Sequence, residues 1–297
     1  MFFLNPKMKI LFFSRAEICR SASEVEALVQ SAERFGFDWA VNRELAECIF
    51  RFTGQALPES KIYGSSIGKQ PQESIMVCYG GDGTLLEGIH RLDGASIAVT
   101  GINSGHLGFL STASKEQTDE IFGRISCGEL RTQQRTMLAI EGLVPDTTLH
   151  ALNEVAVQSL GATMIRTRVS IDGRHVATCD GSGIIIATPT GSTAYSLSAG
   201  GPVVEPSCRC MIISPLAPHN LTMRPVVIPD TSVISLETVA RNRQATISAD
   251  NRTFTLDEGG SVTIRLSERS VFLAVPHNNS FYDTLRDKMM WGMEIRK

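Results

Sequence analysis

The hydrophobic pattern of this 297-residue chain changes once, near its 128th residue, and that change limits the folds open to the chain. Before it, short apolar runs alternate with stretches whose apolar residues recur at helical spacing, such as Lys9 to Phe13 followed by Val25 to Phe35. After it, short strand-like runs recur between turn residues, such as Thr167 to Ile171. The pattern predicts an α/β domain with a parallel sheet and flanking helices over residues 1–128, and a β-rich, sandwich-like domain over residues 129–276.

Further signals predict where helices begin and end. Ser21, followed three residues later by Glu24, has the spacing of a capping box and predicts a helix start. A last helical pattern, Ser280 to Met290, predicts that the closing segment 277–297 packs back on the first domain. Apolar spacing predicts further helices over residues 44–50, 85–92 and 115–125.

The charge balance argues against a polyanionic partner. The chain has 28 Lys and Arg against 31 Asp and Glu, and it has no basic run that would hold nucleic acid or an anionic membrane. No stretch reaches the roughly 18 uncharged apolar residues that a spanning helix needs. Seven cysteines without paired C-x-x-C motifs favour free thiols over a disulfide framework, a zinc site, or a redox element at Cys208 and Cys210. We therefore expect a cytoplasmic protein with neither a nucleic-acid nor a membrane partner.

A glycine-rich loop predicts a phosphate site. The apolar run Ser74 to Tyr79 leads directly into Gly80, Gly81, Asp82, Gly83 and Thr84, and a helical pattern follows. We expect the three glycines to turn the backbone with positive φ and to present N–H groups to an anion at the start of the helix. The loop lacks the Gly-Lys-Ser/Thr ending of a Walker loop and the G-x-G-x-x-G spacing of a dinucleotide fold. The residues predicted to bind phosphate are Gly80, Gly81, Gly83 and Thr84.

Asp82 distinguishes this loop from a purely structural turn. A carboxylate among phosphate-binding amides can accept a proton from an attacking hydroxyl, or it can help to hold a metal. The alternative is a tight turn with a solvated aspartate.

A second segment, Thr188 to Pro202, is composed mainly of small and hydroxyl residues and follows an Ile-rich strand. Pro189 stiffens its entry, Gly191 allows a turn, and the hydroxyl residues suit a helix start. The small side chains would let the ring of a ligand approach the backbone. A closely packed helix start is the alternative interpretation.

The two segments together resemble known kinases. Gly80 to Thr84 resembles the nucleotide site of a superfamily that includes NAD kinases, lipid kinases and 6-phosphofructokinases, and Thr188 to Pro202 resembles the signature of the NAD kinases. Further segments resemble NAD kinases in the family's order: Gly105 to Leu110, Leu152 to Val155, Pro218 to Leu221 with Arg224 and Pro225, and Phe281 to Trp291.

The resemblance implies an enzyme that transfers phosphate from ATP, or from another phosphoryl donor, to the 2′-hydroxyl of the adenosine ribose of NAD. NAD would lie in the cleft between an α/β domain and a β-rich domain. Asp82 would be the catalytic proton acceptor, and Asn153 and Glu154 would bind the dinucleotide. The residues expected to bind NAD are Asp82, Gly83, Asn153, Glu154, Asp180, Thr193, Ala194, Tyr195, Ser196, Leu197 and Ser198.

The resemblance also implies a divalent metal ion, Mg²⁺, bound together with the nucleotide, and no residue of the chain is assigned as a metal ligand. NAD and ATP are the expected small-molecule substrates. The family further implies a homo-oligomer, either a dimer or a tetramer.

Three positions depart from the family pattern. Ser182 stands where NAD kinases usually carry an aspartate. Asp180 could supply that carboxylate from two residues upstream, or it could stand where a basic residue is common. Arg252 replaces a usual glutamine and could meet a phosphate or face solvent. Glu87 stands where an arginine is common, so that positive charge would have to come from elsewhere, for example from Arg91.

Two rival functions remain open on the sequence alone. A lipid or sugar kinase of the same superfamily would share Gly80 to Thr84 but should lack the Thr188 to Pro202 segment. A catalytically weak dinucleotide-binding sensor would fit the departures at Ser182 and Arg252, although Asp82 is intact.

Overall fold

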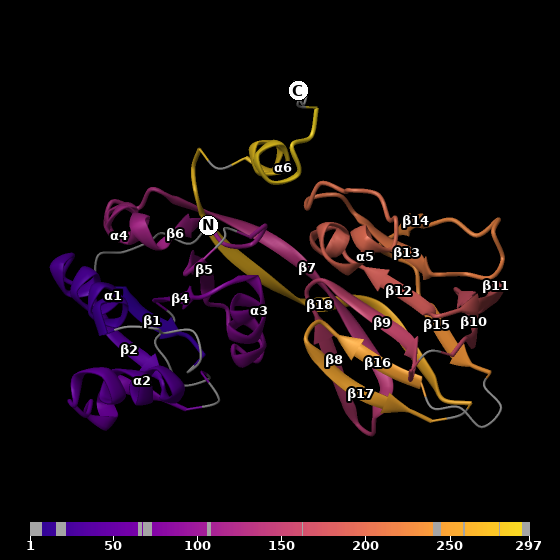
Figure 1. Cartoon of the computed structure of the whole chain (residues 1–297), viewed down its shortest axis with the longest axis horizontal. Helices are drawn as coiled ribbons and strands as arrows, with labels where there is room; N and C mark the ends of the chain where they lie inside the picture. Colours follow the sequence, from indigo (N-terminus) through magenta and orange to yellow (C-terminus); the bar gives the residue numbers. More distant parts are fainter. Residues whose placement is uncertain are drawn as a thin grey trace. The chain divides into compact units, whose positions relative to one another are not determined.

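The chain forms two compact units (Figure 1), the first comprising residues 1–134 and 271–297 and the second residues 135–270. Two long strands, β7 (Leu130–Val144) and β18 (Ser261–Pro276), carry the chain from one unit to the other. The computed structural model describes residues 8–15, 22–64, 67, 73–105, 108–161, 163–239, 245–257, 259–278 and 280–292.

The first unit alternates strands and helices, as the sequence predicts. In chain order its further elements are β1 (Lys9–Phe13), α1 (Ala22–Arg34), β2 (Asp38–Asn42), α2 (Arg43–Thr53), the 3-10 turn η1 (Glu59–Lys61), β3 (Ile62–Tyr63), β4 (Ser74–Tyr79), α3 (Asp82–Arg91), β5 (Ala98–Asn103), β6 (Ala113–Ser114), the 3-10 turn η2 (Lys115–Gln117), α4 (Thr118–Ser126) and α6 (Phe281–Met289).

The strands of the first unit form a parallel sheet in the order β3-β2-β1-β4-β5, and β18 pairs with β5 through Leu273 and Val99. The sheet runs outward from β1 to β2 and β3, and then returns to the other side of β1 with β4 and β5. The chain therefore reverses direction across the sheet between β1 and β4. In open α/β sheets, ligands bind outside the carboxyl ends of the strands at such a switch point.

Helices pack on both faces of this sheet, which explains why its strands are continuous apolar runs. On one face, Phe12 of β1 packs with Leu28 of α1 and Phe122 of α4 in a buried cluster. On the other face, α3 lies so close to the sheet that a Cβ at Gly88 would stand 2.7 Å from the sulfur of Cys78 and 3.1 Å from the ring of Phe13.

One helix boundary differs from the sequence-based expectation in a way that affects the candidate site. The helix expected from Leu85 begins three residues earlier, at Asp82, with Gly81 as its N-cap. Asp82 therefore lies in the first turn of a helix, where the helix dipole favours a negative charge, rather than in a free loop. Ser21, the expected cap of the first helix, lies outside the described residues.

The second unit consists mainly of antiparallel strands. One sheet has the order β14-β13-β12-β9-β16-β17, and the other pairs β11-β10-β15-β18, with β7 joined to β18 and to β8. Two short helical turns, η3 (Thr190–Thr193) and α5 (Tyr195–Ser198), follow β12. The strands are β8 (Thr147–Ala151), β9 (Glu154–Ser159), β10 (Ile165–Ile171), β11 (Arg174–Gly181), β12 (Gly183–Ala187), β13 (Cys210–Leu216), β14 (Val226–Pro229), β15 (Ile234–Thr238), β16 (Ala245–Ala249) and β17 (Arg252–Leu256).

The core of the second unit lies between its two sheets. Val157 of β9 and Ile186 of β12 pack there with Leu236 of β15 and Ile264 of β18. The opposite face of β12 is also covered, because Ile185 packs in a smaller cluster that includes residues of the segment after α5. These contacts confirm the expected combination of an α/β domain and a β-rich, sandwich-like domain. No helix among the described residues is both long and apolar enough to cross a membrane.

Replacing Gly88 by alanine tests the close packing of α3. The added methyl group would overlap the sulfur of Cys78, and overpacking of this kind costs about 1–3 kcal/mol, which is at least as large as the gain of about 1 kcal/mol in helix propensity. We expect a lower urea midpoint for Gly88→Ala. The matched control is Gly123→Ala in α4, where the new Cβ would stand 3.5 Å from the ring of Phe35, an ordinary contact. Equal or higher stability of Gly88→Ala would contradict this account of the packing.

Candidate active site

Hydrogen bonds fix the carboxyl ends of β1, β2 and β4 to one another. The hydroxyl of Ser14 donates to the carbonyl of Tyr79 at 2.8 Å. The side chain of Asn42 accepts from the amide of Ser14 at 3.1 Å and donates to its carbonyl at 2.8 Å. The three strands therefore end in a fixed arrangement at the switch point of the sheet, directly before the glycine-rich segment.

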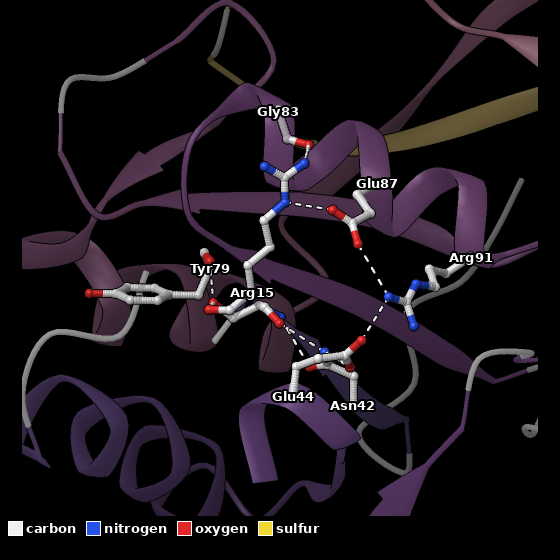
Figure 2. A network of polar contacts seen from close by, with 8 residues as sticks. Arg15, Asn42, Glu44, Tyr79, Gly83, Glu87 and Arg91 are labelled. Carbon is white, nitrogen blue, oxygen red and sulfur yellow. Dashed lines mark hydrogen bonds and ion pairs between the residues drawn. The ribbon is translucent and has the colours of Figure 1, made fainter. Parts of the chain in front are cut away.

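A network of charged side chains surrounds the start of α3 (Figure 2). Arg15 donates to the carbonyl of Gly83 at 2.9 Å and to the carboxylate of Glu87 at 2.5 Å. Arg91 binds the other oxygen of Glu87 at 3.2 Å and the carboxylate of Glu44 at 2.7 Å. Burial alone would lower the pKa of Arg91, but these two carboxylates raise it.

This network adds Arg15 to the possible sources of positive charge that the sequence left open. Arg91 is held by two carboxylates and lies over the ring of Phe13, whereas the guanidinium of Arg15 reaches the first turn of α3. Sequence reasoning missed Arg15, because its position depends on β1 and β4 being neighbours in the sheet. Knowledge of the strand order would have pointed to Arg15, because this residue follows β1 and β1 pairs with β4, the strand that leads into α3.

The side chain of Asp82 is fully engaged in hydrogen bonds. Its Oδ2 accepts from the amides of Phe109 at 2.8 Å and Leu110 at 3.2 Å. Its Oδ1 accepts from the amide of Ser111 at 3.2 Å and from the Ser111 hydroxyl at 3.0 Å. A Cβ at Gly108 would stand 2.0 Å from Oδ1, so this close approach requires glycine. The alternative of a tight turn with a solvated aspartate is therefore wrong.

The glycines of the loop do not share one conformation, which corrects the expectation of positive φ at all three. Gly80 has a φ of 148°, whereas the φ of Gly81 is −81° and Gly83 lies within α3. A Cβ at Gly81 or Gly83 would meet no atom of the described chain within 4 Å. Thr84 is buried in the first turn of α3, where its amide donates to the carbonyl of Gly81 at 2.9 Å. No atom of the described residues therefore blocks a close approach to the backbone at Gly81 or Gly83.

In the second unit, one aspartate organises the segment that contains Asn153 and Glu154. Asp250, in the turn between β16 and β17, accepts from the amides of Leu152 at 2.8 Å, Asn153 at 2.7 Å and Glu154 at 3.2 Å. A Cβ at Gly191 would stand 2.0 Å from the carbonyl oxygen of Asn153, so the segment after β12 lies directly against this loop. Sequence reasoning missed this role of Asp250.

Glu154 is a buried carboxyl group with few donors. It is 9% exposed, and one of its oxygens, Oε2, has no hydrogen-bond partner among the described residues. Burial, together with the nearby charge of Asp250, raises the pKa of Glu154 to about 7, and the amide of Tyr195 opposes that shift by donating to the carboxylate. The structure thus brings Glu154 and Tyr195 together.

The other predicted members of the segment after β12 have different surroundings. Ser196 is fully buried, and its hydroxyl lies 2.9 Å from that of Ser214, so it serves the packing of the unit. Tyr195 is exposed, and its hydroxyl donates to Gln158 at 3.2 Å. The remaining members of the segment are half-buried or exposed: Thr193, Ala194, Leu197 and Ser198.

Two departures from the family pattern have structural explanations. Asp180 pairs with Arg166 on the neighbouring strand at 2.7 Å, so its carboxylate already has a partner, and a role toward NAD stays a prediction. Arg252 is half-buried rather than solvated, because its guanidinium donates to the carbonyl of His150. Burial lowers the pKa of Arg252, although Asp250 opposes that shift. Ser182 takes part in the backbone pairing at the start of β12.

Comparison with known proteins identifies the family. Residues 7–130 match the model of the ATP-NAD kinase N-terminal domain, and residues 152–276 match that of the ATP-NAD kinase C-terminal domain. The chain is 33% identical over 290 residues to the NAD kinase of Porphyromonas gingivalis W83, with 97% of this chain and 99% of the relative covered. It is 37% identical over 292 residues to the NAD kinase of Ralstonia nicotianae GMI1000, with 97% and 94% covered.

Solved structures agree with this match. A yeast NADH kinase complexed with NADH superposes with a TM-score of 0.82 over 98% of this chain and 90% of that chain at 22% identity, which shows a shared fold. An NAD kinase from Archaeoglobus fulgidus in complex with ATP superposes with a TM-score of 0.73 over 95% of this chain and 99% of that chain at 27% identity. Both halves of the sequence, the relatives and the fold thus lead to one assignment: the chain is a kinase and belongs to the NAD kinase family.

Proposed function

We propose that this chain transfers the terminal phosphoryl group of ATP to the 2′-hydroxyl of the adenosine ribose of NAD, which yields ADP and NADP. The observation that carries the proposal is the position of Asp82, a carboxylate in the first turn of α3 at the switch point of a parallel sheet. Phosphoryl transfer depends mainly on positioning and on neutralising charge, so a phosphate-binding backbone beside a carboxylate suits it.

The first unit would bind the phosphates of the donor. The first N–H groups of an α-helix point out of its N-terminus and, together with the helix dipole, favour an anion, although in α3 the amide of Thr84 already donates to the carbonyl of Gly81. The open space beside Gly81 and Gly83 would admit a phosphate close to the backbone. Arg15, fixed by Glu87 and the carbonyl of Gly83, adds a guanidinium at the same helix end.

Asp82 would act as the general base. As the ribose 2′-oxygen forms its bond to the γ-phosphorus, its proton would pass to the Asp82 carboxylate, and the bond to the leaving ADP oxygen would break. The amides of Phe109 to Ser111 hold that carboxylate in one orientation. General-base assistance of this kind contributes about 10²–10⁴-fold to the rate.

The second unit would bind NAD through Asn153, Glu154 and the segment from Thr193 to Ser198. An amide side chain can both donate to and accept from the edge of a base, and a carboxyl group can hydrogen-bond sugar hydroxyls. Asp250 supports this arrangement because it fixes the backbone of Asn153 and Glu154.

A magnesium ion is compatible with these residues when the nucleotide supplies most of its ligands. Among the described residues, no group of three or more His, Cys, Asp or Glu side chains could hold a metal ion. Mg²⁺ in phosphoryl-transfer sites is commonly bound by substrate phosphates and water, with one or two carboxylates. Such an ion would neutralise phosphate charge during the transfer.

The cytoplasmic location and the dimeric or tetrameric state stay predictions. No disulfide joins the six cysteines of the described chain, which fits a reducing compartment without identifying one. The matching family models and relatives are NAD kinases and do not favour the rival functions of a lipid or sugar kinase or of a catalytically weak sensor.

The central experiment incubates the purified protein with Mg-ATP and NAD⁺ and measures NADP⁺ with an NADP-specific dehydrogenase. We expect NADP⁺ from the wild type and a loss of about 10²–10⁴-fold in kcat for Asp82→Asn, with NAD binding retained. The matched control is Asp119→Asn, since Asp119 is also held by a serine, Ser31, but lies in α4. Near wild-type turnover by Asp82→Asn would show that Asp82 is not the base. Product with polyphosphate but not with ATP would correct the donor.

Removing the metal should separate binding from turnover. In excess EDTA we expect NADP⁺ formation to stop, because the phosphate charge is no longer neutralised, while NAD⁺ still binds in calorimetry. Activity should return when excess Mg²⁺ is added. Undiminished activity in EDTA would overturn the proposed requirement for a divalent ion.

Glu154 should make stability depend on pH. Because its pKa in the folded chain, about 7, lies above the ordinary value of 4.5, the folded state retains this proton at pH values where the unfolded state has lost it. The contribution of Glu154 to the free energy of unfolding is therefore complete below pH 4.5 and is lost as the pH rises through 7. The free energy of unfolding changes by about 3 kcal/mol over this range.

The test of Glu154 compares urea unfolding of wild type and Glu154→Gln from pH 4.5 to 8. Glutamine is neutral throughout, so the variant should lose this part of the pH dependence and gain stability relative to the wild type as the pH rises. Glu141→Gln, on a more exposed carboxyl group of the same unit, serves as the control and should keep the wild-type slope. Parallel curves for wild type and Glu154→Gln would contradict the prediction.

A further inference from the structure

The described residues fill the acceptor capacity of the Asp82 carboxylate. A carboxylate has two oxygens with about four acceptor positions between them. Phe109 and Leu110 each donate an amide to Oδ2, and Ser111 donates both its amide and its hydroxyl to Oδ1. A base that must take a proton from a substrate hydroxyl needs to accept a hydrogen bond from that hydroxyl first. One of the four donors must therefore leave before Asp82 can act.

Three of the four donors cannot leave without moving the backbone. The amides of Phe109, Leu110 and Ser111 belong to a segment that packs tightly against β5. A Cβ at Gly101 would stand 3.1 Å from the Cα of Ser111, and the next amide, that of Thr112, donates to the carbonyl of Gly101 at 3.0 Å. The fourth donor is different, because the hydroxyl of Ser111 leaves Oδ1 by rotation about a single side-chain bond.

We propose that the hydroxyl of Ser111 occupies the acceptor position on Oδ1 of Asp82 into which the substrate hydroxyl donates, and that it rotates away when that hydroxyl arrives. Ser111 is then a positioning residue that acts through Asp82. It keeps the carboxylate oriented until the substrate hydroxyl replaces it. The inference rests on the proposed function, because it takes Asp82 as the base.

The exchange predicts a particular pattern of affinities. In the wild type, the 2′-hydroxyl of NAD gains a hydrogen bond to Asp82 while the Ser111 hydroxyl loses one. The 2′-hydroxyl therefore adds little to the affinity for NAD. In Ser111→Ala the acceptor position has no side-chain donor, and the same hydroxyl gains a bond to a charged group without displacing another. Such a bond is worth roughly tenfold in affinity. The preference for NAD over its 2′-deoxyadenosine analogue should therefore grow about tenfold in Ser111→Ala.

The experiment measures both dissociation constants by calorimetry without a phosphoryl donor, using NAD⁺ and the analogue that lacks the adenosine 2′-hydroxyl. A ratio of affinities cancels any general loss of stability or binding in a variant. Ser111→Thr, which keeps a hydroxyl, should restore the wild-type ratio. In an Asp82→Asn background, adding Ser111→Ala should leave the ratio unchanged, because the coupling passes through the carboxylate.

The matched control is Ser31→Ala. The Ser31 hydroxyl also donates to a carboxylate, that of Asp119, at 2.6 Å, so the variant loses the same kind of bond elsewhere in the first unit. Its affinity ratio should equal that of the wild type. An unchanged ratio in Ser111→Ala would overturn the inference. An unchanged ratio would leave the proposed function intact if the wild type forms NADP⁺ and Asp82→Asn does not. In that case only the role of Ser111 would be rejected.

Discussion

A carboxylate that accepts N–H groups from consecutive residues of a neighbouring loop organises the candidate site in both units. Asp82 collects the amides of residues 109–111, and Asp250 collects those of residues 152–154. A buried amide without a partner costs about 1–3 kcal/mol, so each loop depends on its carboxylate. Each carboxylate, in turn, has its negative charge stabilised by several donors. The residues proposed to bind NAD and to accept its proton owe their positions to these two interactions.

Glu154 has the opposite environment, although it lies next to one of these clusters. Asp82 is surrounded by donors, whereas Glu154 is buried with one oxygen unpartnered among the described residues and a second carboxylate nearby. Burial and like charge both favour the neutral form of a carboxyl group. One chain thus holds two carboxyl groups in contrasting environments, one with four hydrogen-bond donors and one with an oxygen that has no partner among the described residues.

The sequence predicted the parts of the fold that depend on local patterns. The apolar runs and helical spacing before residue 128 predicted the parallel sheet, and Gly80 to Thr84 predicted a turn into a helix, although the helix α3 begins at Asp82 and only Gly80 of the three glycines has positive φ. The contacts that were missed join residues far apart in the chain. Asp250 reaches Asn153 only because the register of β16 against β9 brings its turn there. Arg15 reaches Gly83 only because β1 and β4 are neighbours. Hydrophobic spacing carries no information on strand order or register, so neither contact could be predicted.

The two strands that carry the chain between the units have a consequence for synthesis on the ribosome. The second unit is an insertion within the first, because the first resumes at Val271. All residues of the second unit therefore emerge before β18 can pair with β5 through Leu273 and Val99. Until then, β5 has among the described strands only the two-residue strand β6 besides β4, and exposed sheet edges promote aggregation. Nascent chains should therefore pass through a stage in which the second unit has emerged completely while the sheet of the first is still incomplete.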